Sequence, residues 1–407
     1  MTDRPAQRLD WTDVPLARLD MPKGEMVLHR SLTSGLTWRP GDPAGVFWGV
    51  GDRGPNIKPK DAVKHYGLKQ LKPLTELDGA KIMPLPGTGP ALARFRLDGG
   101  RIKPEALFEL RYADGTLLGG LPPPAAQGDE DEPVFDLAGA PLSASRAGAD
   151  SEGIAALPDG RFWIAEEYGP SLLLIDAEGV IERRVVPQGA GTLFAGSPAP
   201  VVEALPALAR ARKHNRGFEA LALSADGTVL YAAFQSPLAH PDRAAHDAGD
   251  VVRIWALDPL EATVLAEYAY PLEPPGAFAR DCAKGRVEHG DVKVSELAAL
   301  PDGSLLVLER VTLSTHIYRV RPKTPVPPCY LDPDQRPSLE QLGQAGAAAA
   351  GVTLLNKALV LSTDHHPEIC ADLEGMLVLP DGALLLANDS DYGTEGAGTQ
   401  FWRVDPR

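Results

Sequence analysis

The chain has 407 residues, of which 44% are hydrophobic and 23% are charged, and its formal net charge is −15. This composition is typical of a globular protein, and the negative balance excludes a general nucleic-acid binder, which needs a basic face. No apolar run approaches the roughly 18 residues of a membrane-spanning helix, and the N-terminus lacks the apolar segment of a signal peptide, so neither feature is expected.

Pairs of short apolar runs around a turn recur along the chain. A single strand, EMVLHR, comes first, and a loose copy of the pair, SGLTWRPGDPAGVFWGVGDRG, begins at Ser34. Four clearer copies follow: SEGIAALPDGRFWIAEE from Ser151, FEALALSADGTVLYAAFQ from Phe218, SELAALPDGSLLVLERV from Ser295 and LEGMLVLPDGALLLANDSD from Leu373. Asp-Gly between such runs predicts a β-hairpin with a type I′ turn, in which both central residues have positive φ.

Further strand-like segments follow each hairpin, such as SLLLIDAEGVIERRVVP after the copy at Ser151. The repeating unit is therefore about four strands. Such units in series predict an all-β fold, specifically a β-propeller of five or six four-stranded blades. The chain ends with TQFWRV, the third strand of a last blade, and we expect the N-terminal strand EMVLHR to complete that blade and close the ring.

The domain organisation follows from this repeat. Residues 1–23 form an N-terminal extension, and residues 24–407 form one propeller domain. Pro-, Gly- and Ala-rich insertions near 111–150, 187–215 and 322–352 are typical of surface loops, and 338–352 predicts a short helix within the last of them. Three cysteines, Cys282, Cys329 and Cys370, form no disulfide framework and no CxxC metal motif, although one pair could bridge.

Acidic residues flank the hairpins at both ends. Across a two-residue turn, the residue numbers of any two paired positions add up to the same value. With the turn at Asp159-Gly160, this rule places Glu152 opposite Glu167. Like charges in directly opposite positions destabilise an antiparallel pair, so their recurrence indicates a role beyond chance. The same rule predicts three further pairs: Glu374 with Asp389, Glu296 with Glu309, and Glu219 with Phe234.

The propeller geometry predicts where these acids gather. The chain enters each blade by its innermost strand, so the start of that strand and the end of the next share one mouth of the central channel. A carboxylate cluster binds cations, pairs with Arg or Lys, or holds protons at raised pKa values, and hard oxygen ligands favour Ca²⁺ or Mg²⁺ over Zn²⁺. The metal ligands predicted on this basis are Asp52, Glu152, Glu167, Glu219, Glu296, Glu309, Glu374 and Asp389.

Cationic residues are expected at the same mouth. Arg53 follows Asp52, and three more lie beside the acids: Arg216, Lys293 and Arg310. A metal surrounded by Arg and Lys is a combination used in phosphate recognition. His365 and His366 belong to the same face.

Structural interpretations compete with each of these assignments. The glutamates at the strand ends could accept hydrogen bonds from backbone amides of neighbouring blades, and Arg53 and Arg216 could neutralise the acids without any ligand. The two histidines could belong to a polar loop. Glu296 lies one residue nearer its turn than Glu152, so its side chain could face the other way unless a bulge intervenes.

The segments DSEGIAALPDGRFWIAEEYGPSLLLID, GVGDRGPN and DLEGMLVLPDGALLLANDSDYG resemble the phytase-like family described as "esterase-like activity of phytase". The resemblance extends from about Ser31 to Val404 and implies a propeller-like protein, periplasmic or secreted, with phosphoester hydrolysis as its activity. The residues within the matching segments are Asp52, Arg53, Glu152, Glu166, Glu167, Glu374 and Asp389, which adds Glu166 to the candidate ligands.

These observations predict a metal-dependent, calcium-binding phosphoester hydrolase, acting as a monomer on a small-molecule substrate. The expected catalytic residues are Glu152, Glu167, Arg53, Arg216, Lys293 and Arg310. No GxSxG motif indicates a nucleophilic serine.

Two alternatives share this fold. The first is a metal-dependent lactonase or carboxylesterase, which Asn388 beside Asp389 and Asn215 near Glu219 fit loosely. The second is a non-catalytic binding module with a structural metal.

Overall fold

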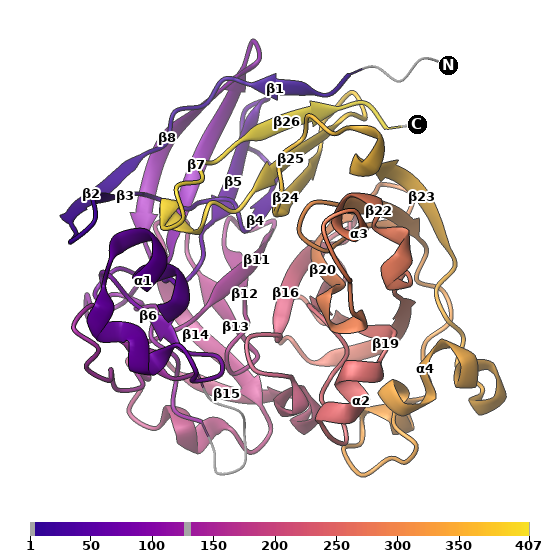
Figure 1. Cartoon of the computed structure of the whole chain (residues 1–407). Helices are drawn as coiled ribbons and strands as arrows, with labels where there is room; N and C mark the ends of the chain where they lie inside the picture. Colours follow the sequence, from indigo (N-terminus) through magenta and orange to yellow (C-terminus); the bar gives the residue numbers. More distant parts are fainter. Residues whose placement is uncertain (1–4, 126–131, 407) are drawn as a thin grey trace.

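The computed structural model describes residues 5–125 and 132–406, and it confirms the predicted all-β fold. Five sheets, each built on four antiparallel strands, carry most of the chain (Figure 1). None of the helices in the described ranges is long and apolar enough to cross a membrane.

The sheets follow one another along the sequence. The first contains β4 (Gly35–Thr37), β5 (Val46–Val50), β7 (Ala91–Asp98) and β8 (Arg101–Glu109). The second contains β11 (Ser151–Ala156), β12 (Phe162–Glu166), β13 (Ser171–Ile175) and β14 (Val180–Pro187), with β9 (Arg111–Tyr112) and β15 (Val201–Leu205) parallel to β14. The third contains β16 (Phe218–Leu223), β17 (Leu230–Phe234), β18 (Val251–Leu257) and β19 (Val264–Pro271). The fourth contains β20 (Lys293–Ala299), β21 (Leu305–Arg310), β22 (Thr315–Val320) and β23 (Lys357–Ser362).

The fifth sheet joins the two ends of the chain. Its strands are β24 (Leu373–Val378), β25 (Leu384–Asn388), β26 (Phe401–Val404) and the N-terminal β1 (Gln7–Leu9), which pairs with β26. The expectation that EMVLHR makes this closure is wrong. That segment is β3 (Glu25–His29), which pairs instead with β2 (Pro15–Asp20), because a tight turn from Met21 to Gly24 folds it back.

The first strands of the five sheets form a ring. Each of β4, β11, β16 and β20 contacts the first strand of the next sheet, and β24 contacts β4. Glycine makes this approach possible, because a Cβ on Gly153 would lie 2.6 Å from the Leu221 nitrogen. The hydrophobic core lies between adjacent sheets, where Trp163 and Trp255 are fully buried in one cluster.

The hairpin turns differ from the predicted type. Gly160 has a φ of 95°, but Asp159 is not left-handed, and the Gly160 amide donates to the Leu157 carbonyl at 3.0 Å. Leu157–Gly160 is therefore a four-residue turn with Pro158 at its second position, where the fixed φ of proline suits a type I turn. The type I′ prediction is wrong here, and turns of the same kind follow Leu300 and Leu379.

This turn shifts the register, so the predicted carboxylate pairs are also wrong. Ser151 pairs with Glu166, and Leu373 pairs with Asn388. Four of the five first strands, β11, β16, β20 and β24, also carry a β-bulge near their start, which re-aims the side chains there. In the fourth sheet Val294 pairs with Glu309, and in the third sheet Phe218 pairs with Phe234.

Short helices lie in the connections between strands. They are α1 (Pro59–Tyr66), α2 (Arg243–Ala248), α3 (Ala279–Cys282) and α4 (Leu339–Ala347), and α4 confirms the helix predicted in 338–352. A two-stranded parallel sheet joins β6 (Lys81–Ile82) to β10 (Val134–Phe135). Residues 57–82, between β5 and β7, include α1 and β6 and pack on a small apolar cluster of their own.

Candidate functional site

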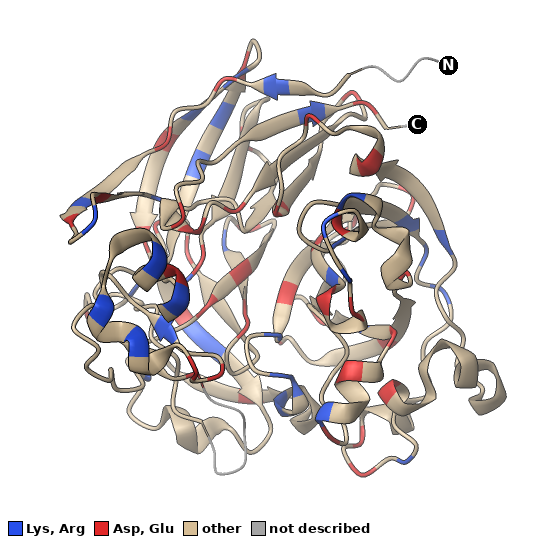
Figure 2. Ribbon diagram, in the orientation of Figure 1, with Lys and Arg blue, Asp and Glu red and all other residues tan. Residues whose placement is uncertain are grey.

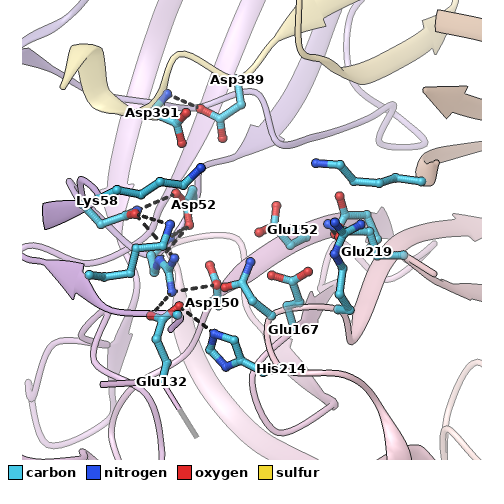
Figure 3. A pocket seen from close by; sticks show the side chains of 18 of the residues that line it. Asp52, Lys58, Glu132, Asp150, Glu152, Glu167, His214, Glu219, Asp389 and Asp391 are labelled. Carbon is cyan, nitrogen blue, oxygen red and sulfur yellow. Dashed lines mark hydrogen bonds and ion pairs between the residues drawn. The ribbon is translucent and has the colours of Figure 1, made fainter. Parts of the chain in front are cut away.

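A cavity of about 820 Å³ lies where the first strands of the sheets begin (Figure 3). Its wall is almost entirely charged or polar, and it brings together residues from all five sheets and from the 57–82 insertion. The predicted site residues that line it are Asp52, Arg53, Glu152, Glu167, Arg216, Glu219, Lys293, Arg310, Glu374 and Asp389.

Two groups of three carboxylates meet at Glu152. Oxygens of Asp52, Asp150 and Glu152 lie within 4.8 Å of one another, and so do oxygens of Glu152, Glu167 and Glu219. Glu152 and Glu219 reach the cavity from the bulged starts of β11 and β16, and Glu167 follows the end of β12. The bulges and the strand ends thus place side chains from two sheets within reach of one ion.

The central carboxylates have no hydrogen-bond donors. Within the described part of the chain, no group donates to the side chain of Glu152 or Glu167, and buried oxygens Glu167 Oε1 and Asp150 Oδ1 have no partner. Buried polar groups in folded proteins are nearly always satisfied, so these oxygens are open to a cation or a water molecule in the cavity. An anion cannot fill this role, because it would add to the negative charge.

Burial and mutual repulsion act on the same groups. Burial, followed by the charges of Glu219 and Asp150, raises the pKa of both Glu152 and Glu167 well above the usual range. Burial and the neighbouring Asp150 raise the pKa of Asp52 similarly. A cation bound among these groups would remove both penalties.

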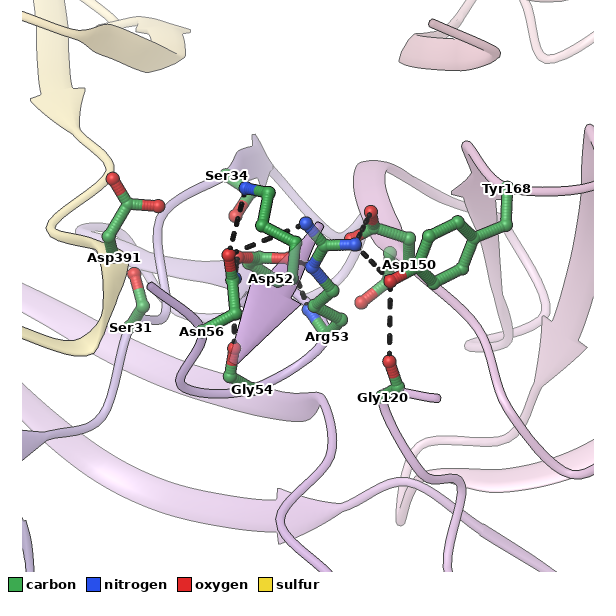
Figure 4. Close-up of polar contacts among 12 residues, drawn as sticks. Ser31, Ser34, Asp52, Arg53, Gly54, Asn56, Gly120, Asp150, Tyr168 and Asp391 are labelled. Carbon is green, nitrogen blue, oxygen red and sulfur yellow. Dashed lines mark hydrogen bonds and ion pairs between the residues drawn. The ribbon is translucent and has the colours of Figure 1, made fainter. Parts of the chain in front are cut away.

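Arg53 is held in place by the cavity wall (Figure 4). Its Nη1 lies 2.6 Å from Glu132 Oε1 and 3.3 Å from Asp150 Oδ2, and it also donates to the Tyr168 hydroxyl. Burial would lower the pKa of Arg53, but the charges of Asp150 and Glu132 outweigh it and raise the pKa. Arg53 therefore positions Asp150 through Nη1, while its Nε lies 3.9 Å from Asp52 Oδ1 and has no hydrogen-bond partner.

Arg310 is similarly committed. It pairs with Glu374, lies 3.0 Å from Asp372 Oδ1 and donates to Ser295 Oγ at 2.9 Å. Its guanidinium thus neutralises acids on the fifth-sheet side of the cavity, which matches the structural interpretation of the cationic residues.

Two other cations have donors to offer. Arg216 Nη1 is buried without a hydrogen-bond partner, and no ion pair holds Lys293 within the described residues. The charge of Arg310 and then burial lower the pKa of Lys293 to about 8. Both side chains are therefore suited to an incoming anion.

Backbone strain concentrates around the cavity. Five non-glycine residues in the described ranges have positive φ, and three of them, Asn215, Asp372 and Asp391, line the cavity, while Tyr392 follows Asp391. Left-handed backbone is costly for non-glycine residues and clusters at functional sites. The strain therefore supports a functional assignment for this cavity.

Three predicted ligands lie outside the cavity. Glu166 accepts a hydrogen bond from Ser171 Oγ at 2.8 Å, and Glu309 accepts one from the Tyr270 hydroxyl at 2.6 Å. Glu296 accepts a hydrogen bond from the Leu36 amide at 3.0 Å and so links β20 to β4. This orientation is the one expected if the position of Glu296 nearer its turn directs its side chain away from the cavity. Burial raises the pKa of Glu296 well above the usual range.

The predicted histidines, asparagines and cysteines have the following positions and contacts. His365 and His366 do not line the cavity, and His366 faces Glu368. Asn388 is committed to backbone groups of Asp389, Gly398 and Gln400, whereas Asn215 lines the cavity. The cysteines are unbridged.

Several cavity residues were missed from the sequence. Asp150 directly precedes the strand that carries Glu152, so its place in the DSEG segment was an available signal. Glu132 belongs to the insertion near 111–150 that was interpreted as a surface loop, yet its side chain is buried and lies 3.3 Å from His214. Lys58 and Lys81 belong to an insertion that no repeat predicts.

The known proteins that resemble this chain include one distant sequence relative and two distant structural ones. A protein of Arthroderma benhamiae described as an uncharacterized secreted protein is 28% identical over 215 residues, which is 48% of this chain and 40% of that protein. A Thermus thermophilus structure described as an oxidoreductase (glucose dehydrogenase) is 12% identical, with 98% and 99% of the two chains covered and a TM-score of 0.38. A luciferin-regenerating enzyme is 9% identical, with 99% and 92% covered and a TM-score of 0.35.

The match to the fungal protein thus spans less than half of that relative. The two structural likenesses, with TM-scores below 0.5, carry no argument about this chain. The family model described as "Phytase-like: Esterase-like activity of phytase" matches residues 31–392, so the chain belongs to this phytase-like family.

Proposed function

We propose that the chain is a five-bladed β-propeller hydrolase that cleaves a phosphoester with the help of a bound divalent cation, in the first instance Ca²⁺. The observation that carries this proposal is the pair of buried carboxylates, Glu152 and Glu167, which lack donors and lie within 4.8 Å of Glu219 in the cavity. Membership of the phytase-like family supports a hydrolase.

The donor set fits a hard cation. All candidate ligand atoms are carboxylate oxygens, which suit Ca²⁺ or Mg²⁺ better than softer metals. Glu152, Glu167 and Glu219 would hold the ion, and Asp52 and Asp150 would complete the site from the other side of Glu152. A bound ion of this kind supplies positive charge that lowers the pKa of water and offsets charge on phosphoryl oxygens.

The protein's own groups bind and orient the substrate. Arg216 and Lys293 would hold the phosphate oxygens, since both line the cavity and have donors available. Arg53 and Arg310 would keep Asp150 and Glu374 in position, because their guanidinium groups are already paired. We further propose a monomer exported to the periplasm or the medium.

Hydrolysis assays test this function. Protein treated with EDTA is given p-nitrophenyl phosphate, bis-p-nitrophenyl phosphate, phytate or a lactone, with and without Ca²⁺. We expect Ca²⁺-dependent phosphate release that falls at least about 100-fold in Glu152→Gln, as is typical when an electrostatic group of a catalytic centre is removed. A matched control is Glu178→Gln, an exposed acid outside the cavity, which should retain full activity.

Other outcomes would favour the alternatives. Lactone opening without phosphate release would replace the phosphoesterase by a lactonase, and Arg216→Ala would then have little effect on activity. A rise in melting temperature with Ca²⁺ but no turnover of any substrate would favour a structural ion in a binding module.

A further inference from the structure

Residues 57–82 form a basic insertion at the rim of the cavity. This segment, here called the basic module, holds six of the 13 lysines in the chain and only three acidic residues, although the whole chain has a net charge of −15. Figure 2 shows these lysines gathered on and around α1. The module lies between β5 and β7, the second and third strands of the first sheet, whereas the equivalent connection of the second sheet runs only from Glu166 to Ser171.

The lysines of the module are not neutralised. Lys60, Lys64, Lys69 and Lys72 are exposed, and within the described chain none of their ammonium groups forms an ion pair. Several partly exposed arginines elsewhere are paired, as Arg161 is with Asp159 at 2.6 Å and Arg403 with Asp381 at 2.6 Å. The module therefore presents a cluster of four uncompensated positive charges to solvent.

The charge of the module continues into the cavity. Lys58 and Lys81 line the cavity wall, and Lys60 lies two residues from Lys58 at the start of α1. Lys60 and Lys64 are four residues apart on α1, so they project from the same side of the helix. Lys58, at the N-cap of α1, thus joins the cavity wall to the helix that carries Lys60 and Lys64.

The module is built to display charge rather than apolar surface. Ile57, Ala62, Leu68 and Leu71 pack into its own core, and the one large apolar side chain that it exposes is Leu77. Binding to a lipid surface normally combines basic residues with inserted aromatic or aliphatic groups. A flexible polyanion in solution fits this surface better than a membrane does.

We infer that the basic module is a binding surface for a polyanionic chain of phosphate or phosphodiester groups, one end of which enters the cavity. This inference rests on the proposed function for the hydrolysis of the end that enters the cavity, but binding of the polyanion to the basic module requires no turnover. The expected partner is thus larger than the small-molecule substrate predicted from the sequence.

Binding of inorganic polyphosphate at several NaCl concentrations tests the inference. The variant combines K60Q, K64Q, K69Q and K72Q, none of which lines the cavity. Its control combines K103Q, K284Q, R286Q and K323Q, which remove the same charge from exposed positions elsewhere. Because each neutralised phosphate contributes about 0.7 to the salt slope of a flexible strand, we expect the module variant to lose about 3 units of slope.

The accompanying affinities decide the outcome. We expect Kd at low salt to rise at least about 30-fold in the module variant and less than threefold in the control, with hydrolysis of p-nitrophenyl phosphate unchanged in both. Equal losses in the two variants, or no loss in either, would overturn the inference. Tighter binding to anionic vesicles than to polyphosphate would overturn it in favour of a membrane. Absence of turnover in the wild type would count against the proposed function alone.

Discussion

Replacing Glu152 with glutamine should stabilise the metal-free protein. Glu152 belongs to both carboxylate groups, with Asp52 and Asp150 on one side and Glu167 and Glu219 on the other. Glutamine keeps the size and shape of the side chain but removes its charge. The substitution therefore isolates the electrostatic repulsion within the cluster.

The magnitude follows from the spacing. Two full charges 4.8 Å apart repel by about 3 kcal/mol at an effective dielectric constant of 20. The raised pKa values keep part of the cluster protonated, which reduces the repulsion that is actually present. We expect the free energy of unfolding to rise by about 1–3 kcal/mol, or roughly 1–4 °C in Tm for a protein of this size.

Calcium should reverse the order of stability. Ca²⁺ at 100 times its Kd stabilises the wild type by about 2.7 kcal/mol through mass action, and the variant should lose most of this gain. The assay is thermal unfolding of both proteins in EDTA and over a Ca²⁺ titration at pH 7.5. Wild type should melt below the variant without Ca²⁺ and at or above it with Ca²⁺.

Glu309→Gln is the matched control, because Glu309 is a buried carboxylate with partners. It accepts hydrogen bonds from the Tyr270 hydroxyl, the Glu273 amide and Lys357 Nζ. Its loss should destabilise the protein with or without Ca²⁺, since buried partners are left unsatisfied. If Glu152→Gln behaved like Glu309→Gln in EDTA, the view of Glu152 as an uncompensated charge would be refuted.

Two further predictions concern stability away from the cluster. Burial lowers the pKa of His246 to about 4, so the contribution of neutral His246 to the free energy of unfolding is present above the unfolded pKa of 6.5 and is lost as the pH falls. From pH 7 to pH 5 the free energy of unfolding should fall by about 2 kcal/mol for this reason. Urea unfolding of His246→Asn should therefore show a shallower pH dependence than that of the wild type. Gly153→Ala should cost at least about 2 kcal/mol, because the added Cβ would meet the neighbouring backbone at 2.6 Å, whereas Gly276→Ala, which meets nothing within 4 Å, should be near neutral in the same unfolding assay.

The sheets could be predicted from the sequence because their signals are local and repeated. Four of the five hairpins have two alternating or buried runs around an Asp-Gly turn, and the first hairpin is a looser copy of this pattern. The closing strand could not be identified in this way. Residues 7–9 are few and mainly polar, and their pairing with β26 depends on contacts almost 400 positions away in sequence.

The insertions account for most of the missing site residues. Glu132, His214 and Lys81 come from connections without periodicity, so no register or strand pattern places them. Their positions depend on how each connection packs on the ring, and composition alone assigned the segments of Glu132 and His214 to the surface. Charge provided one unused signal, because the lysines of residues 57–82 stand out in an acidic chain.

The register error did not prevent the cavity residues from being found, and the reason is geometric. A slip of one residue moves a side chain by about 3.3 Å along its strand, which is small beside a cavity of this size, but it changes the face on which that side chain lies. Glu152, Glu219 and Glu374 still reach the cavity because each lies at a bulge, where alternation is interrupted. In β20 the bulge falls at Ser295 and Glu296 comes one position later, so its carboxylate turns to β4 instead. Which acids can bind an ion thus depends on the bulge position in each strand, a feature that hydrophobic alternation alone does not encode.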